Sequence, residues 1–301
     1  MTLNQLGRTP GFLDPRALAK LGGLKLRARR VVEGFVAGLH RSPKHGFSIE
    51  FAQHRDYTPG DDLRYVDWKA YGRTDKLYVK QFEDETNLVC YIVLDISESM
   101  TYGSDSESLT KLAYAQTAAA SLAWLVLHQR DAVGLITCDT QVRANVRPST
   151  TPAHLKQMIA AMEGSDSHEQ TAIEQVLHDV AERLHRRTLV IVISDFLDDV
   201  DSIIAGLRHL RHKQHEVRLL QVLDPAEVDF PFDQPMLFKG LEQLSDIVAD
   251  GHAFRAAYLE EFSRYQRQLA TQCRGLQVDY LLVRTDQPVE RALSQLCAVR
   301  G

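Results

Sequence analysis

Three oxygen-bearing side chains alternate along the stretch that follows an apolar run. Residues 88–94 are apolar throughout, as in a strand buried on both faces of a parallel sheet. Asp95, Ser97 and Ser99 come directly after this run, and in an extended loop their alternating side chains can converge on one point. Because no Cys or His stands among them, the set suits a hard cation, Mg²⁺ before Ca²⁺, and not zinc.

Two further oxygen-bearing residues stand at the expected ends of other elements. Asp195 follows the apolar run 189–193, and Thr171 opens the helical pattern that leads to that run. Taken singly, each has a simpler explanation as the cap of a helix. In a parallel sheet, however, ligand sites lie at the carboxyl ends of the strands. The three pieces in this order therefore favour one shared site.

The chain from residue 88 onward supplies the elements of such a sheet. Apolar runs alternate with segments of helical spacing, which predicts an α/β fold with a doubly wound, mostly parallel sheet and right-handed crossovers. We expect strands at residues 88–94, 132–138, 141–147, 189–193, 217–223 and 278–283, and helices at 15–39, 109–130, 152–163, 171–186, 200–212, 252–273 and 289–296.

The chain is expected to have two parts. Residues 86–301 form the main domain, with a small β excursion at about 225–250, where the alternation of strand and helix is interrupted. Residues 1–85 contain a helix and then an irregular or β segment that is rich in turn signals and poor in long apolar runs. Since that segment is too poor in apolar runs to form a core alone, we expect it to pack on the main domain.

The pattern Asp95-x-Ser97-x-Ser99, Thr171 and Asp195 resembles the metal-ion-dependent adhesion site of the von Willebrand factor A fold. The resemblance covers roughly residues 86–290 and implies a Rossmann-type sheet. It also implies that the hydroxyls bind a divalent cation, usually Mg²⁺ with Mn²⁺ or Ca²⁺ as alternatives, and that the two Asp act directly or through water.

Two positions depart from this resemblance. Glu98 stands inside the loop where a small or polar residue is usual, and Phe196 stands where Gly commonly follows the Asp. Both leave the five ligand positions intact. Mg²⁺ prefers six ligands, so five protein positions leave one that a carboxylate of a partner can fill. We therefore expect a non-catalytic module that binds a partner protein through the metal.

A second resemblance lies in the N-terminal part. The segment from 55 to 69 looks like the signature of the family called domain of unknown function fifty-eight; its residues are Arg55, Tyr57, Asp61, Asp62, Arg64, Asp67, Trp68 and Lys69. Members are similar to bacterial proteins encoded beside MoxR-type AAA+ ATPases, which implies an adaptor or chaperone-like partner of such an ATPase or of its client. The segment is either a structural ion-pair network or a docking surface.

Charge and composition limit the classes of partner and the cellular location that we expect. Residues 1–82 hold 15 Lys and Arg against 8 Asp and Glu, whereas residues 83–301 hold 20 against 32. The basic cluster at 25–30 is short and has no interleaved aromatic residues, so we expect it to meet acidic protein and not nucleic acid. The N-terminus has no signal-peptide pattern, and the longest apolar stretch, 118–127, is about half a bilayer span. These features predict a cytoplasmic protein without a membrane span.

The sequence also bears on catalysis. It contains no P-loop and no H-E-x-x-H, G-x-S-x-G or G-x-G-x-x-G motif. The four Cys lie far apart, which argues against a zinc ribbon and favours free thiols. We therefore predict that the protein is not an enzyme. Two alternatives remain open: a Mg²⁺-dependent phosphoryl-transfer hydrolase, and a von Willebrand factor A-like scaffold whose metal site is unused.

Overall fold

A computed structural model of the chain describes residues 13–39, 54–56, 78–80, 88–164, 172–238 and 247–298. The chain divides into two compact units, one made of residues 1–41 and 88–301 and the other of residues 42–87. In the second unit, strand β1 (His54–Asp56) pairs antiparallel with β2 (Tyr78–Lys80).

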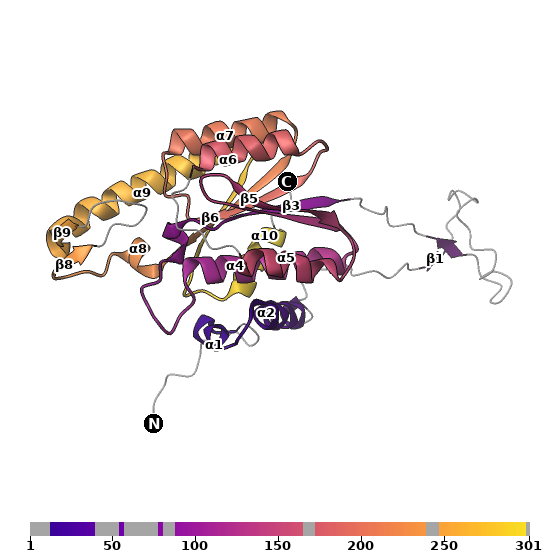
Figure 1. Cartoon of the computed structure of the whole chain (residues 1–301), viewed down its shortest axis with the longest axis horizontal. Helices are drawn as coiled ribbons and strands as arrows, with labels where there is room; N and C mark the ends of the chain where they lie inside the picture. Colours follow the sequence, from indigo (N-terminus) through magenta and orange to yellow (C-terminus); the bar gives the residue numbers. More distant parts are fainter. Residues whose placement is uncertain are drawn as a thin grey trace, which may run out of the picture. The chain divides into compact units, whose positions relative to one another are not determined.

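A six-stranded sheet forms the centre of the first unit, in the order β10-β7-β6-β3-β4-β5 (Figure 1). Its strands are β3 (Val89–Asp95), β4 (Ala132–Cys138), β5 (Val142–Ser149), β6 (Leu189–Ser194), β7 (Glu216–Leu223) and β10 (Asp279–Arg284). All neighbours are parallel except β4 and β5, which are antiparallel. The predicted α/β fold with a mostly parallel sheet is confirmed.

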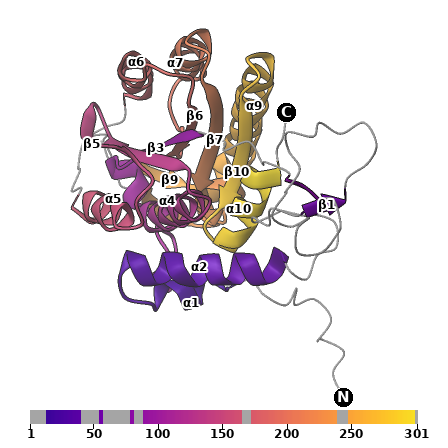
Figure 2. The ribbon, with the colours of Figure 1, turned by 90° about the vertical axis from the view of Figure 1, so that its right-hand side faces the viewer.

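Helices cover both faces of this sheet, and each face has its own apolar core (Figure 2). One core includes side chains of α4 (Lys111–His128), α5 (His154–Glu163) and α10 (Val289–Ala298), and the other includes side chains of α6 (Ile173–Arg183), α7 (Val200–His212) and α9 (Gly251–Gly275). The central strands β3 and β6 are therefore buried on both sides. That burial explains why they read as continuous apolar runs.

The helix predicted over residues 15–39 is two helices. α1 (Pro15–Ala19) ends before a break, and α2 (Leu24–Leu39) begins after it and packs on the outside of α4. At the break Gly23 has a φ of 77°, a backbone conformation that residues with a Cβ rarely adopt. The break turns the buried side chains of Leu24, Ala28 and Val31 onto the core.

The strand order creates a switch point beside β3. The chain leaves β3 for β4 on one side and later returns to β6 on the other, so the crossovers diverge at the carboxyl ends of β3 and β6. In open α/β sheets this is where ligands bind. The 3₁₀ helix η2 (Glu98–Thr101) follows β3 at this edge.

Between β7 and α9, the described residues form the short helix α8 (Pro225–Asp229) and an antiparallel pair of strands, β8 (Pro235–Phe238) and β9 (Ile247–Asp250). All four Cys are free thiols, as predicted. In the part of the chain that the structure describes, no helix combines the length and apolar character that crossing a membrane requires.

Replacement of Gly206 by Ala tests the close packing of α7 on α6. A Cβ at Gly206 would lie 2.7 Å from the Cβ of Leu177, so one helix must shift. We expect the free energy of unfolding to fall by about 1–3 kcal/mol in urea denaturation. Gly275→Ala is the matched control, because nothing lies within 4 Å of its added Cβ near the end of α9. Equal stability of the two variants would contradict the packing described.

Candidate metal centre

Asp95 and Ser194 end two neighbouring strands, and this brings their side chains together. Leu94 of β3 pairs in register with Ile193 of β6, so the next residue of each strand reaches the same edge. The Ser194 hydroxyl donates to Asp95 Oδ2 at 2.6 Å, and the backbone N–H of Ser97 donates to Asp95 Oδ1 at 2.9 Å. The carboxyl is 1 % exposed and is held by neutral donors on both oxygens.

The two predicted serines lie beside Asp95. Ser97 is buried at the start of η2, and its Oγ is 3.1 Å from the Oγ of half-buried Ser99. The backbone N–H of Ile96 donates to the carbonyl of Cys138 at 2.8 Å, which fixes this loop to the end of β4. The alternating loop therefore brings three of the predicted oxygen ligands together, as its spacing suggested.

Asp195 lies at the same edge, directly after β6. Its side chain is buried, its Oδ1 accepts from the N–H of Leu197 at 3.3 Å, and its carbonyl accepts from Gln221 Nε2 at 2.6 Å. Asp195 is close enough to Asp95 for their charges to interact.

Phe196, which stands where Gly commonly follows the Asp, adopts a backbone conformation that favours Gly. Its φ is 49°, in the left-handed region, which costs a residue with a Cβ roughly 1–2 kcal/mol. The buried ring and two hydrogen bonds offset this cost: the Phe196 N–H donates to Ser194 Oγ at 3.0 Å, and the Tyr265 hydroxyl donates to the Phe196 carbonyl. The loop after Asp195 thus keeps a shape that usually needs Gly.

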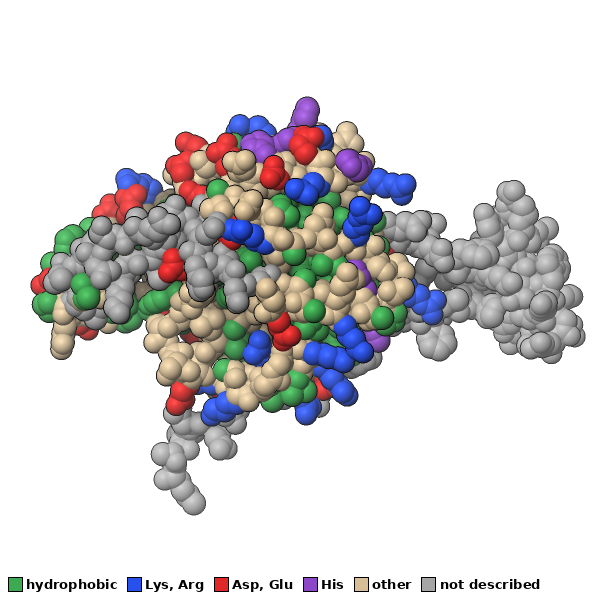
Figure 3. Space-filling view, in the orientation of Figure 1, with side chains coloured by type: hydrophobic (Ala, Val, Ile, Leu, Met, Phe, Trp, Pro, Cys, Tyr) green, Lys and Arg blue, Asp and Glu red, His purple; other side chains and the backbone are tan. Residues whose placement is uncertain are grey.

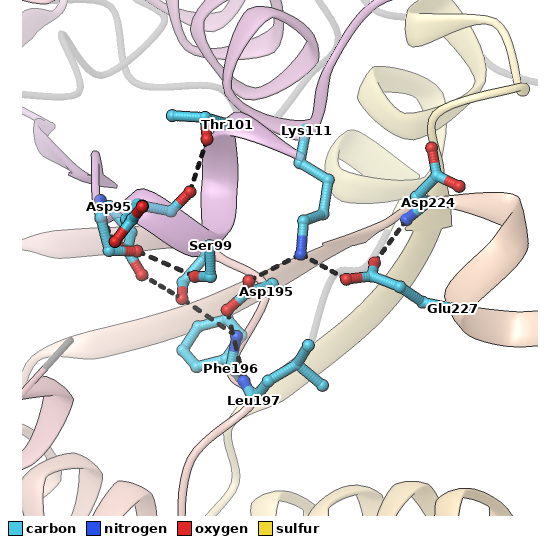
Figure 4. A network of polar contacts seen from close by, with 12 residues as sticks. Asp95, Ser99, Thr101, Lys111, Asp195, Phe196, Leu197, Asp224 and Glu227 are labelled. Carbon is cyan, nitrogen blue, oxygen red and sulfur yellow. Dashed lines mark hydrogen bonds and ion pairs between the residues drawn. The ribbon is translucent and has the colours of Figure 1, made fainter. Parts of the chain in front are cut away.

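Lys111, which the sequence analysis did not single out, lies at the centre of the network (Figure 4). Its Nζ is 2.8 Å from Asp195 Oδ2 and 2.6 Å from Glu227 Oε1, and the side chain is 1 % exposed. A signal existed in the sequence. Lys111 is the only Lys, Arg, Asp or Glu in α4 and stands in its first turn, where the helix dipole disfavours a cation. Such a lysine needs a carboxylate partner.

Glu227 belongs to a capping box at the start of α8. The backbone N–H of Asp224 donates to Glu227 Oε2 at 2.8 Å, and the Asp224 carboxyl accepts from Ala226 N at 2.8 Å and Ser104 N at 3.0 Å. The sequence from 224 to 227 carries the pattern of an acidic cap with Glu three residues later. That pattern predicts a helix start, but it does not predict that the Glu also binds a lysine.

The network holds more negative than positive charge. Burial, and then the charge of Asp195, raise the pKa of Asp95 to about 7. Burial also raises the pKa of Glu227, although Lys111 opposes the shift. Burial alone would lower the pKa of Lys111, but its two carboxylate partners outweigh burial and raise it, so the ammonium stays charged at neutral pH.

The donor chemistry fits a hard divalent cation. Asp95, Ser97, Ser99 and Asp195 offer only oxygen atoms, and Asp95 has no ion pair with any side chain that the structure describes. No group of three or more His, Cys, Asp or Glu placed to hold a metal exists among those side chains, so a metal here would rely on hydroxyl oxygens as well. Such an oxygen set suits Mg²⁺, Mn²⁺ or Ca²⁺.

Several predicted residues cannot be compared with the structure. Thr171 lies outside the described residues, although the N–H of the next residue, Ala172, donates to the carbonyl of Asp139 at the end of β4. Arg55 lies in β1 opposite Val79. The other signature residues lie outside the described part of the chain: Tyr57, Asp61, Asp62, Arg64, Asp67, Trp68 and Lys69.

A second polar cluster lies on the surface of α6 and α7, where acidic, basic and histidine side chains gather at the top of the view in Figure 3. His178 and His209 face each other with their Nδ1 atoms 2.6 Å apart, and Glu182 Oε1 lies 2.9 Å from His209 Nε2. This spacing is that of a shared hydrogen bond. Two imidazole ligands of one metal at 2.0–2.1 Å would lie farther apart.

Comparison with known proteins gives a family. The family model described as "Protein of unknown function DUF58" matches residues 53–268. An uncharacterized protein of Mycobacterium tuberculosis is 27% identical over 283 residues, which cover 91% of this chain and 86% of that protein.

Among solved structures, the conserved hypothetical protein BatB from Bacteroides thetaiotaomicron is similar with a TM-score of 0.47 and 16% identity, covering 70% of this chain and 97% of that one. An aerotolerance-related membrane protein from Bacteroides fragilis gives a TM-score of 0.43 and 17% identity, covering 69% and 97%.

The prediction of a cytoplasmic protein is contradicted, because the similar Bacteroides fragilis structure is described as that of a membrane protein. The physical reason is general. The surface and core of a globular α/β domain are built in the same way whether the domain works in the cytoplasm or at a membrane, so composition does not separate the two cases.

The raised pKa of Asp95 predicts how stability depends on pH in metal-free buffer with EDTA. A carboxyl whose pKa is higher in the folded state disfavours folding once it ionises. This penalty is absent below the unfolded pKa of about 4, grows with pH, and is complete above about 7. Relative to Asp95→Asn, the wild-type protein should therefore lose on the order of a few kcal/mol of unfolding free energy across that window, as measured by urea denaturation at each pH.

Asp201→Asn is the matched control, because it removes an exposed carboxylate from the first turn of α7. Its stability should follow the wild-type pH dependence. Parallel curves for wild type and Asp95→Asn would contradict the burial of an ionisable carboxyl at this position.

Proposed function

The chain belongs to the DUF58 family of proteins of unknown function, and on that premise we propose that it is a non-catalytic interaction module whose binding depends on a divalent cation. One observation carries the proposal: four oxygen-bearing side chains from the ends of β3 and β6 meet in a buried site with excess negative charge. They are Asp95, Ser97, Ser99 and Asp195. The arrangement supports a site of the kind found in the von Willebrand factor A fold.

Each residue has a defined part in this proposal. Ser97 and Ser99 supply hydroxyl oxygens to the cation, Asp95 and Asp195 supply charge directly or through water, and Thr171 is the fifth predicted ligand. Ser194 and the Ser97 N–H orient the Asp95 carboxyl. When bound, Mg²⁺, or Mn²⁺ or Ca²⁺ in its place, supplies a coordination position that a carboxylate can take. Half-buried Ser99 marks the side of the site that is open to such a ligand.

The proposed partner is a protein that presents an Asp or Glu. The resemblance of residues 55–69 to the family signature supports a MoxR-type AAA+ ATPase, or the client of that ATPase, with this chain as an adaptor or chaperone-like factor. A metal–carboxylate contact suits such a role, because it is directional and can be released by small movements of the loops that carry the ligands.

A second candidate is a scaffold whose metal site is unused. Lys111 favours it, since its ammonium already supplies a cation to Asp195. A Mg²⁺-dependent phosphoryl-transfer hydrolase is the third. It requires a nucleophile or base that reaches a substrate, whereas Asp95 and Lys111 are each 1 % exposed.

Asp95→Ala tests the metal site. Titration of the full chain with Mn²⁺ in a calorimeter should show saturable binding by the wild-type protein and at least about tenfold weaker binding by the variant, because a buried charge beside the ion is lost. Asp201→Asn removes an equal charge from an exposed position and should bind Mn²⁺ as the wild type does. Absence of saturable binding by wild type would favour the unused scaffold and contradict the proposal.

A pull-down tests the partner. The full chain should retain a MoxR-type ATPase in buffer with Mg²⁺ and release it in EDTA, and Asp95→Ala should fail to retain it in either buffer. Retention that is indifferent to EDTA would contradict a metal-mediated contact. Phosphatase activity on generic phosphate esters that is lost in Asp95→Ala would instead favour the hydrolase.

A further inference from the structure

Among the described side chains, Lys111 is the cation that pairs with Asp195. Its ammonium lies between Asp195 and Glu227 (Figure 4), and Lys111 itself stands in the first turn of α4. It also lies 5.8 Å from the centre of the Tyr102 ring. A lysine this buried is tolerated only because two carboxylates neutralise it.

The position of this ammonium bears directly on the proposed metal site. Asp195 Oδ2 is bonded to Lys111 at 2.8 Å, so the Asp195 charge is already compensated in this structure. In Figure 4, Asp95 lies on the side of Asp195 away from Lys111, and no described side chain supplies a cation to it. A divalent ion that binds here must share Asp195 with the ammonium or displace it, and like charges repel strongly in a site of low dielectric.

Resting on that metal site, we propose that Lys111 is an internal counter-ion that competes with the divalent cation for Asp195, and that Glu227 sets the strength of this competition. Glu227 holds the ammonium on the other side at 2.6 Å. When the metal takes the charge of Asp195, Glu227 remains as the partner of Lys111. The lysine therefore stays neutralised in both states.

Glu227 is fixed independently of the metal. Its second oxygen, Oε2, accepts from the Asp224 N–H, and its carbonyl accepts from the hydroxyl of Tyr258 on α9 at 2.7 Å. These contacts keep the Glu227 carboxylate within reach of Lys111 whether Asp195 pairs with the ammonium or with the metal ion. The affinity for metal is then coupled to the short helix α8 and to α9.

A purely structural role for Lys111 makes the opposite prediction. If the ammonium serves to orient Asp195 toward the ion, its removal weakens metal binding, and Glu227 has little influence. In the counter-ion account, removal of Lys111 strengthens metal binding and neutralisation of Glu227 weakens it. The sign of the change separates the two roles.

The test is Mn²⁺ binding to the full chain, followed by the loss of the free Mn²⁺ signal in electron paramagnetic resonance. Lys111→Met keeps most of the length of the unbranched side chain and removes its charge, and should bind Mn²⁺ at least about tenfold more tightly than wild type. Among the described side chains, Glu227→Gln leaves Lys111 with Asp195 as its one carboxylate partner, and this variant should bind Mn²⁺ several-fold more weakly. The double variant keeps the wild-type net charge and should return toward wild-type affinity.

One further variant tests whether the tighter binding occurs at this site. Asp95→Ala combined with Lys111→Met should lose the gain in affinity, because the ion bound more tightly must lie at this site. If Lys111→Met does not fold, Glu227→Gln decides, since weaker binding supports the competition and unchanged or tighter binding overturns it. Thermal unfolding with and without Mn²⁺ provides a second readout, with a larger rise in Tm expected for Lys111→Met than for wild type.

The outcomes separate this inference from the proposed function. Binding by Lys111→Met but not by wild type supports the counter-ion and contradicts a metal-dependent function of the natural chain. Binding by wild type with equal or weaker binding by Lys111→Met overturns the counter-ion and leaves the metal site standing. No binding by any folded variant overturns both.

Discussion

The burial of charge at the carboxyl edge of the sheet is the constraint on which the site depends. Asp95 and Asp195 extend from strands that are covered on both faces, so neither carboxyl can turn to water without disturbing the core. Buried charges need compensation, and the chain supplies it unevenly, with an ammonium beside Asp195 and neutral donors on Asp95. This imbalance is the reason why we propose a cation site at this edge.

The same constraint explains the irregular backbone round the site. The left-handed conformation of Phe196 is held by Ser194 and Tyr265, and the Ser97–Ser99 loop is held by the hydrogen bond from Ile96 to Cys138. Strained backbone persists where the surrounding contacts determine it fully. Because the contacts of Phe196 come from β6 and α9, the loop after Asp195 is linked to elements well outside the site.

The sequence predicts those parts of the site that depend on a local pattern of residues. The apolar runs of β3 and β6 predict buried parallel strands, and parallel strands bring Asp95 and Asp195 to one edge. The pairing of Lys111 with Asp195 and Glu227 could not be predicted, because the partners are 84 and 116 residues away and only the folded sheet brings them together. Helical spacing continues on both sides of Gly22 and Gly23, so the sequence predicts a single helix with a weak middle where the structure has two helices.

The most direct test of the account is the position of the ion itself. Crystals of the full chain grown with Mn²⁺ and measured at a wavelength where manganese scatters anomalously should show a peak about 2.2 Å from the hydroxyl oxygens of Ser97 and Ser99, a ligand distance expected for such a cation. A crystal structure in which Lys111 still bridges Asp195 and Glu227, with manganese bound elsewhere or absent from this edge, would contradict the account.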